Sequence, residues 1–151
     1  MLSNVGVKSL DIADMRINRF DGLELPDEMH ELVTTVKVSK GKHMLFDSAG
    51  HTYFICTAAH ERWRVERRAS LPAARLAFCA ALSPCGTFVY ALGGLSPGGD
   101  FVNTIVRYSF ESDSWQTITG VQFQPFVDAV AVTMPDGIYL LGGTEPGQMP
   151  G

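Results

Sequence analysis

Short apolar runs alternate with clusters of Gly, Pro, Asp and Ser along most of the chain. The runs are rich in β-branched and aromatic residues, and several alternate apolar with polar positions. This pattern predicts many short strands joined by turns, as in a sandwich, a barrel or a propeller. Residues 26–32 (PDEMHEL) have a helix-tolerant composition, but the segment is too short to be stable alone. The chain is therefore expected to be all-β with little helix.

Two of these runs are copies of each other. Residues 87–94 (TFVYALGG) and 138–143 (IYLLGG) both read as strands that end in Gly-Gly. Each follows a turn that contains glycine, and each is preceded by an apolar strand of small residues, FCAAL at 78–82 and AVAVT at 129–133. The two Gly-Gly pairs lie 49 residues apart, which indicates an internal repeat.

A second unit repeats with a fixed spacing. Residues 103–115 (NTIVRYSFESDSW) place Tyr108 five residues after Asn103 and Trp115 seven residues after Tyr108. Residues 51–63 keep the same spacing through Cys56 to Trp63, and residues 5–17 (VGVKSLDIADMRI) keep only the spacing. Each unit reads as a strand, a polar turn and a second strand.

A period near 50 residues built from four short strands resembles the kelch repeat. The WD40 repeat is shorter, and its Gly-His and Trp-Asp signals are not found at the matching places in this sequence. The resemblance implies a partial kelch-type β-propeller of four-stranded antiparallel blades. It is carried by a structural signature of Trp63, Gly93, Gly94, Asn103, Tyr108, Asp113, Trp115, Gly142 and Gly143. The repeat at 32–67 is degenerate, because Asp47-Ser48 replaces Gly-Gly and Cys56 replaces tyrosine.

The repeats divide the chain into four segments. We expect an acidic N-terminal segment at 1–31 with the two outer strands of a preceding blade at 4–20, a degenerate repeat at 32–67, the best-matching repeat at 68–119 and half of a further repeat at 120–151. Propellers usually close with four or more blades. Further kelch repeats in the same chain, or a second copy, are therefore expected to complete the ring.

The kelch pattern also implies packing roles. Trp63 and Trp115 are expected to fill the wedges between blades, with Tyr108 in the same layer. Asp113 is expected to bond its own turn backbone. Arg75 and Arg107 are expected to reach carbonyl or acidic groups of a neighbouring blade.

Composition and charge narrow the function. The 151 residues carry a net charge of −4, which gives no electrostatic case for nucleic acid or an anionic membrane. Three cysteines without paired spacing do not resemble a disulfide framework, and no secretory signal is visible. A cytoplasmic location is the corresponding expectation.

No set of residues predicts catalysis or metal binding. The spacing of His43, His51, Cys56 and His60 matches no zinc signature, and no base accompanies Cys79 or Cys85 in a local motif. The Gly-rich segment 93–100 follows neither Walker nor Rossmann spacing and reads as a mobile loop or a partner-contacting rim. We therefore expect no catalytic residue, no metal and no cofactor.

The leading hypothesis is a protein–protein interaction module that binds a protein or peptide on its loops. The candidate contact residues are Arg75, Leu76, Ala77, Phe78, Leu95, Ser96, Asp100 and Phe101. Because residues 76–78 are apolar, they do not support the acidic-peptide recognition known among kelch proteins. The alternatives are a kelch-like propeller enzyme that acts on a sugar or small molecule, and a subunit whose half-blades are completed by a neighbour.

Overall fold

The computed structural model describes residues 26–39, 42–57, 63–121 and 124–148. These residues are nearly all β, as the sequence predicts, and their helical content is the 3₁₀ turn η1 (Pro146–Gln148). No helix among them is long and apolar enough to span a membrane. The strands are β1 (Leu32–Ser39), β2 (Lys42–Asp47), β3 (Thr52–Thr57), β4 (Trp63–Arg68), β5 (Cys79–Leu82), β6 (Phe88–Leu92), β7 (Ile105–Ser109), β8 (Ser114–Ile118), β9 (Val127–Met134) and β10 (Gly137–Thr144).

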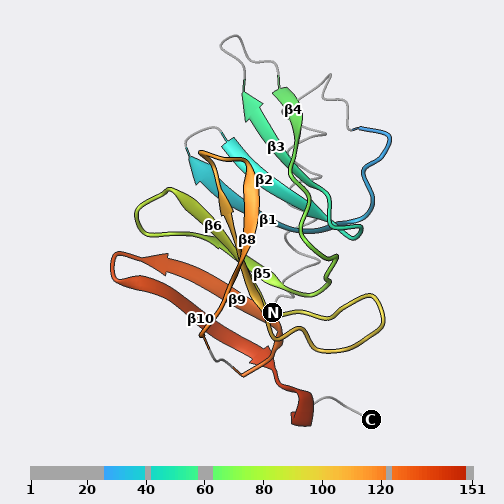
Figure 1. The fold of residues 1–151 in the computed structure, drawn as a ribbon, viewed down its shortest axis with the longest axis vertical. Coiled ribbons are helices and arrows are strands. Elements are labelled where there is room, and N and C mark those ends of the chain that lie inside the picture. Colours follow the sequence, from blue (N-terminus) through green and yellow to red (C-terminus); the bar gives the residue numbers. More distant parts are fainter. Residues whose placement is uncertain (1–25, 40–41, 58–62, 122–123, 149–151) are drawn as a thin grey trace.

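The strands form three antiparallel sheets in chain order (Figure 1). The first sheet is β1-β2-β3-β4, the second is β5-β6-β7-β8, and the third is the β9–β10 hairpin. Within each sheet every strand pairs with the next along the chain, because short turns can join antiparallel strands. The predicted four-stranded antiparallel sheets are confirmed, and the described strands form no closed barrel.

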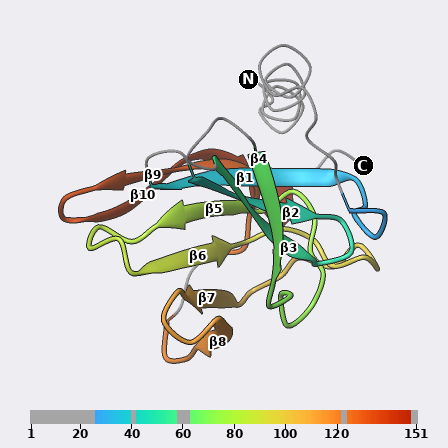
Figure 2. The same ribbon diagram turned by 90° about the horizontal axis from the view of Figure 1, so that it is seen from above.

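Each sheet runs outward from an inner strand. β5 contacts β1 on one side and β9 on the other, so the first strands of the three sheets lie side by side. Figure 2 shows β5, β6, β7 and β8 following one another away from this inner row. This is the arrangement of successive propeller blades.

The main core lies between the first and second sheets. Phe46 and Phe54 of the first sheet pack with Val89, Val106 and Tyr108 of the second, and all five are buried. Trp115 of β8 reaches across to Phe46, with ring centroids 6.0 Å apart, and also lies 5.3 Å from the ring of Tyr108. Aromatic side chains of the outer strands therefore fill the wedge between the two sheets.

The backbone of Ala69 joins these two sheets. Its N–H donates to Asp113 Oδ1 at 3.1 Å, and its carbonyl accepts from Trp115 Nε1 at 2.8 Å and from the Thr52 hydroxyl at 2.6 Å. The Tyr108 hydroxyl donates to the same Asp113 oxygen at 2.6 Å. The expectation that Asp113 bonds its own turn is therefore wrong, because its carboxylate reaches across the junction.

The two arginines expected to reach a neighbouring sheet stay within their own. Arg107 donates to Gln116 Oε1 at 3.0 Å and lies 4.2 Å from the ring centroid of Phe88. Arg75 also bonds groups of the second sheet, as described below. Neither arginine therefore reaches a neighbouring sheet, although Arg75 does bond two backbone carbonyls, as expected.

A glycine pair allows close approach at the second junction. A Cβ at Gly93 would lie 2.6 Å from the ring of Phe126, and one at Gly94 would lie 2.5 Å from the Leu76 carbonyl oxygen. Both glycines also have φ between +70° and +100°, the left-handed region. Gly93 is thus required by contact with the start of the third sheet, and Gly94 by contact with the segment before β5, in addition to the left-handed turn.

Candidate functional site

A pocket lies where the three inner strands begin. Its volume is about 250 Å³, and we call it the inner-strand pocket. Its walls come from all three sheets: Glu31, Leu32, Val33, Ser48, Leu76, Ala77 and Asp128. Loops and strand ends on a rigid scaffold are where binding residues concentrate, so this pocket is the candidate site.

The pocket combines apolar walls with two carboxylates. Leu76 is 37% exposed, and Leu32 is partly exposed beside it. Glu31 and Asp128, which come from opposite ends of the described chain, are both exposed. An apolar contact flanked by negative charge suits a ligand that carries a cationic group on an apolar stem.

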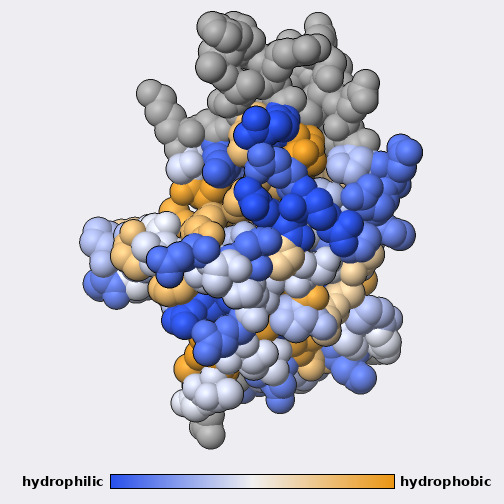
Figure 3. Space-filling model, turned by 45° about the horizontal axis from the view of Figure 1, so that its top comes forward, coloured by the Kyte–Doolittle hydropathy of each residue, from blue (hydrophilic) through white to orange (hydrophobic). Residues whose placement is uncertain are grey.

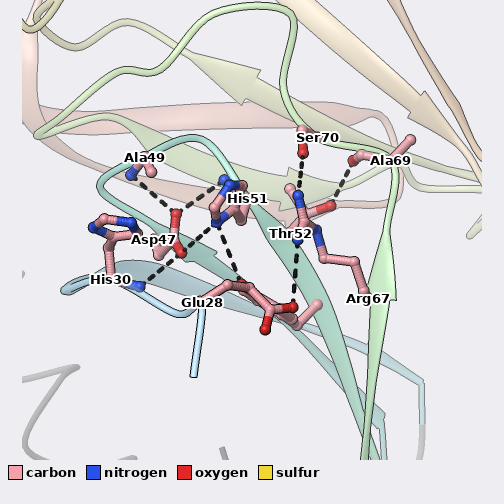
Figure 4. Close-up of polar contacts among 10 residues, drawn as sticks. Glu28, His30, Asp47, Ala49, His51, Thr52, Arg67, Ala69 and Ser70 are labelled. Carbon is pink, nitrogen blue, oxygen red and sulfur yellow. Dashed lines mark hydrogen bonds and ion pairs between the residues drawn. The ribbon is translucent and has the colours of Figure 1, made fainter. Parts of the chain in front are cut away.

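One wall is held by the buried carboxylate of Asp47 (Figure 4). It accepts the backbone N–H groups of His30 at 2.9 Å, Ala49 at 3.0 Å and His51 at 2.9 Å. The Ser48 N–H donates to the Glu31 carbonyl at 2.8 Å, which ties the β2–β3 turn to the start of β1. Asp47 therefore fixes the backbone next to the pocket residues Glu31 and Ser48. The three N–H donors offset the free-energy cost of burying the Asp47 charge.

The ring of His51 extends this network toward the surface. Its Nδ1 lies 3.2 Å from Asp47 Oδ2 and 3.4 Å from the Tyr53 hydroxyl. Tyr53 is fully buried, and desolvation together with the nearby Asp47 charge raises the pKa of its phenol. Arg67 lies over the Tyr53 ring and bonds Glu28 and Ser70 (Figure 4).

The opposite wall is held by Arg75. Its guanidinium donates to the carbonyls of Gly93 at 3.2 Å and Thr104 at 3.1 Å, and to the Thr104 hydroxyl at 3.1 Å. The residue is 3% exposed, and desolvation lowers the pKa of its guanidinium. The prediction that Arg75 is a surface contact residue is therefore wrong, because its donors face the interior and position the neighbouring residues Leu76 and Ala77.

The structure brings the two predicted groups of contact residues together. Leu76 and Leu95 exchange backbone hydrogen bonds of 2.8 Å, and Leu95 also bridges to Phe101. Leu76, Ala77, Leu95, Ser96, Asp100 and Phe101 are at least partly exposed, whereas Phe78 is 2% exposed and belongs to the core. Phe78 is thus a second correction among the predicted contact residues.

The segment at 95–102 is a closed turn. Ser96 N–H donates to the Asp100 carbonyl at 2.8 Å, and Asp100 N–H donates to the Ser96 hydroxyl at 3.2 Å. Val102 N–H donates to the Gly94 carbonyl at 2.8 Å. These bonds give the rim beside Leu76 a defined shape, in place of the mobile loop considered from the sequence.

Two pocket residues have left-handed backbones without being glycine. Ala77 has φ 56° and Asp128 has φ 59°, and the Asp128 N–H donates to the Ala77 carbonyl at 3.0 Å. They stand at matching points of the second and third sheets. This conformation is strained for alanine, and such strain concentrates at binding sites.

The remaining residues singled out in the sequence are dispersed. His43 lies in β2, where desolvation and the nearby Lys37 charge lower the pKa of its imidazole, while Cys56 is buried in β3. His60 and the side chain of Trp63 lie outside the described residues. Within the described ranges no group of three His, Cys, Asp or Glu side chains is placed to hold a metal ion. Asn103 is exposed before β7, and Gly142 and Gly143 lie in β10.

Sequence reasoning missed Glu31, Asp128 and Asp47. Glu31 belongs to the acidic segment 1–31, Asp128 stands in no recognised motif, and nothing in the linear pattern shows that three strand starts converge on them. Asp47 stands where the repeat pattern has the first glycine of Gly-Gly. An acidic residue in place of a turn glycine is the one sequence signal that a side chain, and not a glycine backbone, stabilises this turn.

Comparison with solved structures identifies the fold. A fungal alcohol oxidase of the AA5 family, in complex with copper, superposes with a TM-score of 0.61 and 16% identity, over 80% of this chain and 28% of that chain. The structure of YjhT superposes with a TM-score of 0.65 and 18% identity, over 80% of this chain and 37% of that one. The chain thus spans well under half the length of either neighbour.

These neighbours and the four-stranded antiparallel sheets show a kelch-like propeller fold. At this level of identity the likeness concerns the fold alone. A scan of protein-family models finds no match, and a search of curated proteins finds none either.

Proposed function

We propose that this chain is a kelch-type protein-interaction module whose inner-strand pocket binds a peptide segment of a partner protein. The observation that carries the proposal is the convergence of three sheets on one pocket with apolar walls and two exposed carboxylates. The rim at 95–101, joined to Leu76 by backbone hydrogen bonds, supplies further contact area.

The chemistry of the pocket favours a basic peptide. Glu31 and Asp128 attract a lysine or arginine head group, while Leu32 and Leu76 cover its methylene stem. Charge complementarity of this kind guides association and selects partners more than it adds affinity. The matching ligand is a short segment in which a lysine or arginine stands beside an apolar residue.

Panning a random peptide display library against the full chain tests the proposal. We expect enrichment of peptides with a basic residue next to an apolar one. Glu31→Gln and Asp128→Asn should each weaken an enriched peptide by up to about fivefold, the range of exposed ion pairs. Leu76→Lys should abolish binding, because it places a like charge in the pocket.

The control is Asp136→Asn, since Asp136 is an exposed acid in the β9–β10 turn whose carboxylate accepts the Tyr139 hydroxyl at 2.9 Å. Its affinity should match that of the unaltered chain. Enrichment of acidic peptides, or binding that survives Leu76→Lys, would contradict the proposal.

A second candidate function is catalysis on a sugar or small molecule, and the paired side chains of Asp47 and His51 favour it. A buried carboxylate beside a partly exposed imidazole is a general-base arrangement. A screen of sugars and small alcohols with the full chain and with His51→Ala tests it. Turnover that disappears in the variant supports catalysis, and no turnover by either protein rejects it.

A further inference from the structure

The connector that follows β4 carries a pattern of kinase recognition. Residues 67–71, at the end of β4 and just beyond it, read Arg-Arg-Ala-Ser-Leu. Basophilic serine kinases recognise a serine that follows arginines two and three positions earlier and precedes an apolar residue. Carboxylates in the kinase groove pair with the guanidinium groups, and an apolar pocket takes the next side chain. Among the serines and threonines of the sequence, Ser70 alone has a basic residue three positions before it.

Ser70 and Arg67 present their polar groups at the surface. Both residues are exposed, and Nη2 of Arg67 donates to the Ser70 hydroxyl at 3.1 Å (Figure 4). Figure 3 shows hydrophilic side chains gathered over the upper part of the face it draws, where the first sheet lies. In that sheet β4 carries four charged residues among its six. The Ser70 hydroxyl is therefore accessible to a phosphoryl donor, beside one of the two arginines of the pattern.

The same arginine is placed to bind a phosphate on Ser70. Nη1 of Arg67 lies 3.4 Å from Oε2 of Glu28, and this ion pair is weak because its side chains are 43% and 47% exposed. A phosphoserine carries close to two negative charges and three acceptor oxygens. It bonds a guanidinium more strongly than a neutral hydroxyl does, and it repels a nearby carboxylate. A phosphate on Ser70 is therefore expected to take Arg67 from Glu28.

The neighbours of Ser70 are held in the fold. Leu71 is 6% exposed, and the guanidinium of Arg68 lies 4.8 Å from the ring centroid of Phe54. A kinase groove binds the two arginines and the following leucine in an extended segment, so phosphoryl transfer requires the connector to open locally. The Ser70 hydroxyl bonds Arg67 at the surface, so the connector can close again with the phosphate in place.

We propose that Ser70 is a phosphorylation site for a basophilic serine kinase, and that Arg67 binds the phosphate once it is attached. ATP bound to the kinase is the donor. A bond forms between the Ser70 oxygen and the γ-phosphorus, the bond from that phosphorus to the ADP oxygen breaks, and the hydroxyl proton passes to the carboxylate base of the kinase. This inference is independent of the inner-strand pocket.

Incubation of the full chain with Mg-ATP and the catalytic subunit of cyclic-AMP-dependent protein kinase tests the first part. This kinase is the probe because its groove selects arginines at both positions. We expect one phosphoryl group per chain, assigned to Ser70 by tandem mass spectrometry, and none in Ser70→Ala. A chain that stays unmodified after prolonged incubation, or that is modified elsewhere while Ser70 stays free, would overturn the proposal.

Arg67→Gln tests whether the sequence pattern directs the kinase. It should lower the initial rate of phosphorylation by about tenfold or more, because one charge-assisted pair with the kinase groove is lost. The matched control is Arg107→Gln, which removes the same charge from β7, where the guanidinium bonds Gln116. Its rate should equal that of the unaltered chain, and equal rates for both variants would refute the proposal. Circular dichroism checks the fold, and Arg68→Gln replaces an unfolded Arg67→Gln.

Phosphorus NMR of the phosphorylated chain tests the second part. A nearby cation favours the dianion, so the second pKa of the Ser70 phosphate should lie below the ordinary value of about 6. In Arg67→Gln, phosphorylated by longer incubation, this pKa should return toward about 6. A pKa that is not lowered in the unaltered chain, or one that Arg67→Gln leaves unchanged, overturns the binding of the phosphate by Arg67.

Discussion

Asp47 shows how one side chain replaces a glycine pair. The second sheet makes the corresponding turn with Gly93 and Gly94, whereas the first sheet uses a carboxylate that accepts three backbone N–H groups. In both sheets the turn packs against a segment that leads into an inner strand: Ser48 bonds Glu31 before β1, and Gly94 bonds Phe126 before β9. The substitution therefore preserves the geometry of the inner-strand pocket while removing the sequence signature.

Cys85 is predicted to be the most reactive thiol among the three cysteines. It is exposed at the β5–β6 turn, and the hydroxyls of Ser83 and Thr87, at 3.4 and 2.9 Å, lower the pKa of the thiol from 9.0 to about 7. Cys56 and Cys79 are buried. The rate of alkylation by iodoacetamide should rise with pH through a midpoint near 7, because the thiolate is the nucleophile.

The variant Thr87→Val removes one of these hydrogen bonds and should move the midpoint upward, toward 9. Peptide mapping after brief labelling assigns the modified residue. A midpoint near 9 in the folded chain, or equal labelling of all three cysteines, would contradict the prediction.

At the scale of elements, the glycine pair after β6 fixes how closely the third sheet approaches the second. Gly93→Ala should destabilise the fold by at least about 2 kcal/mol, because its Cβ would overlap the Phe126 ring and carbonyl in a left-handed backbone. Gly86→Ala is the matched control: φ is also left-handed, at 80°, but a Cβ there meets nothing, so the cost should be about 1 kcal/mol. Urea denaturation measures both, and equal losses would refute the packing argument.

The strands could be predicted because each one is a short apolar run bounded by turn residues. FCAAL and TFVYALGG needed no tertiary information to be recognised as β5 and β6. The contacts between sheets could not be predicted in the same way. Asp113 reaches Ala69 across 44 residues of sequence, and neither residue carries a local signal of that bond.

Only part of the site could be predicted, because some of its residues are indicated by the repeat and others depend on contacts between sheets. The positions of Leu76 and Leu95 on one rim follow from the repeat, but the burial of Arg75 depends on Thr104 and Gly93, which fold over its guanidinium. Glu31 and Asp128 required knowledge of how three inner strands are arranged. Sequence periodicity indicates the elements, whereas the pocket depends on their angles in space.

At the scale of the whole molecule, stability should fall from the first junction toward the hairpin. The core between the first two sheets contains several fully buried aromatic and aliphatic side chains, whereas β10 has exposed residues along most of its length. In native-state hydrogen exchange at low protein concentration, β10 amides should exchange faster than those of β2 and β6. Local opening follows the density of buried contacts. Uniform protection of all three strands would contradict this order.

The joint at Ala69 has a consequence for how such a chain can change over generations. Asp113 and Trp115 bond the main-chain N–H and carbonyl of residue 69, and the alanine side chain packs against the core between the first two sheets. A substitution of Ala69 that still fits this core therefore leaves both hydrogen bonds and the alignment of the sheets intact, provided that the two outer-strand residues are kept. Selection then acts mainly on the few side chains that make these hydrogen bonds, while the sequence of the connector can change. In such repeats the geometry of the blades is therefore expected to be conserved longer than the sequence of the connectors.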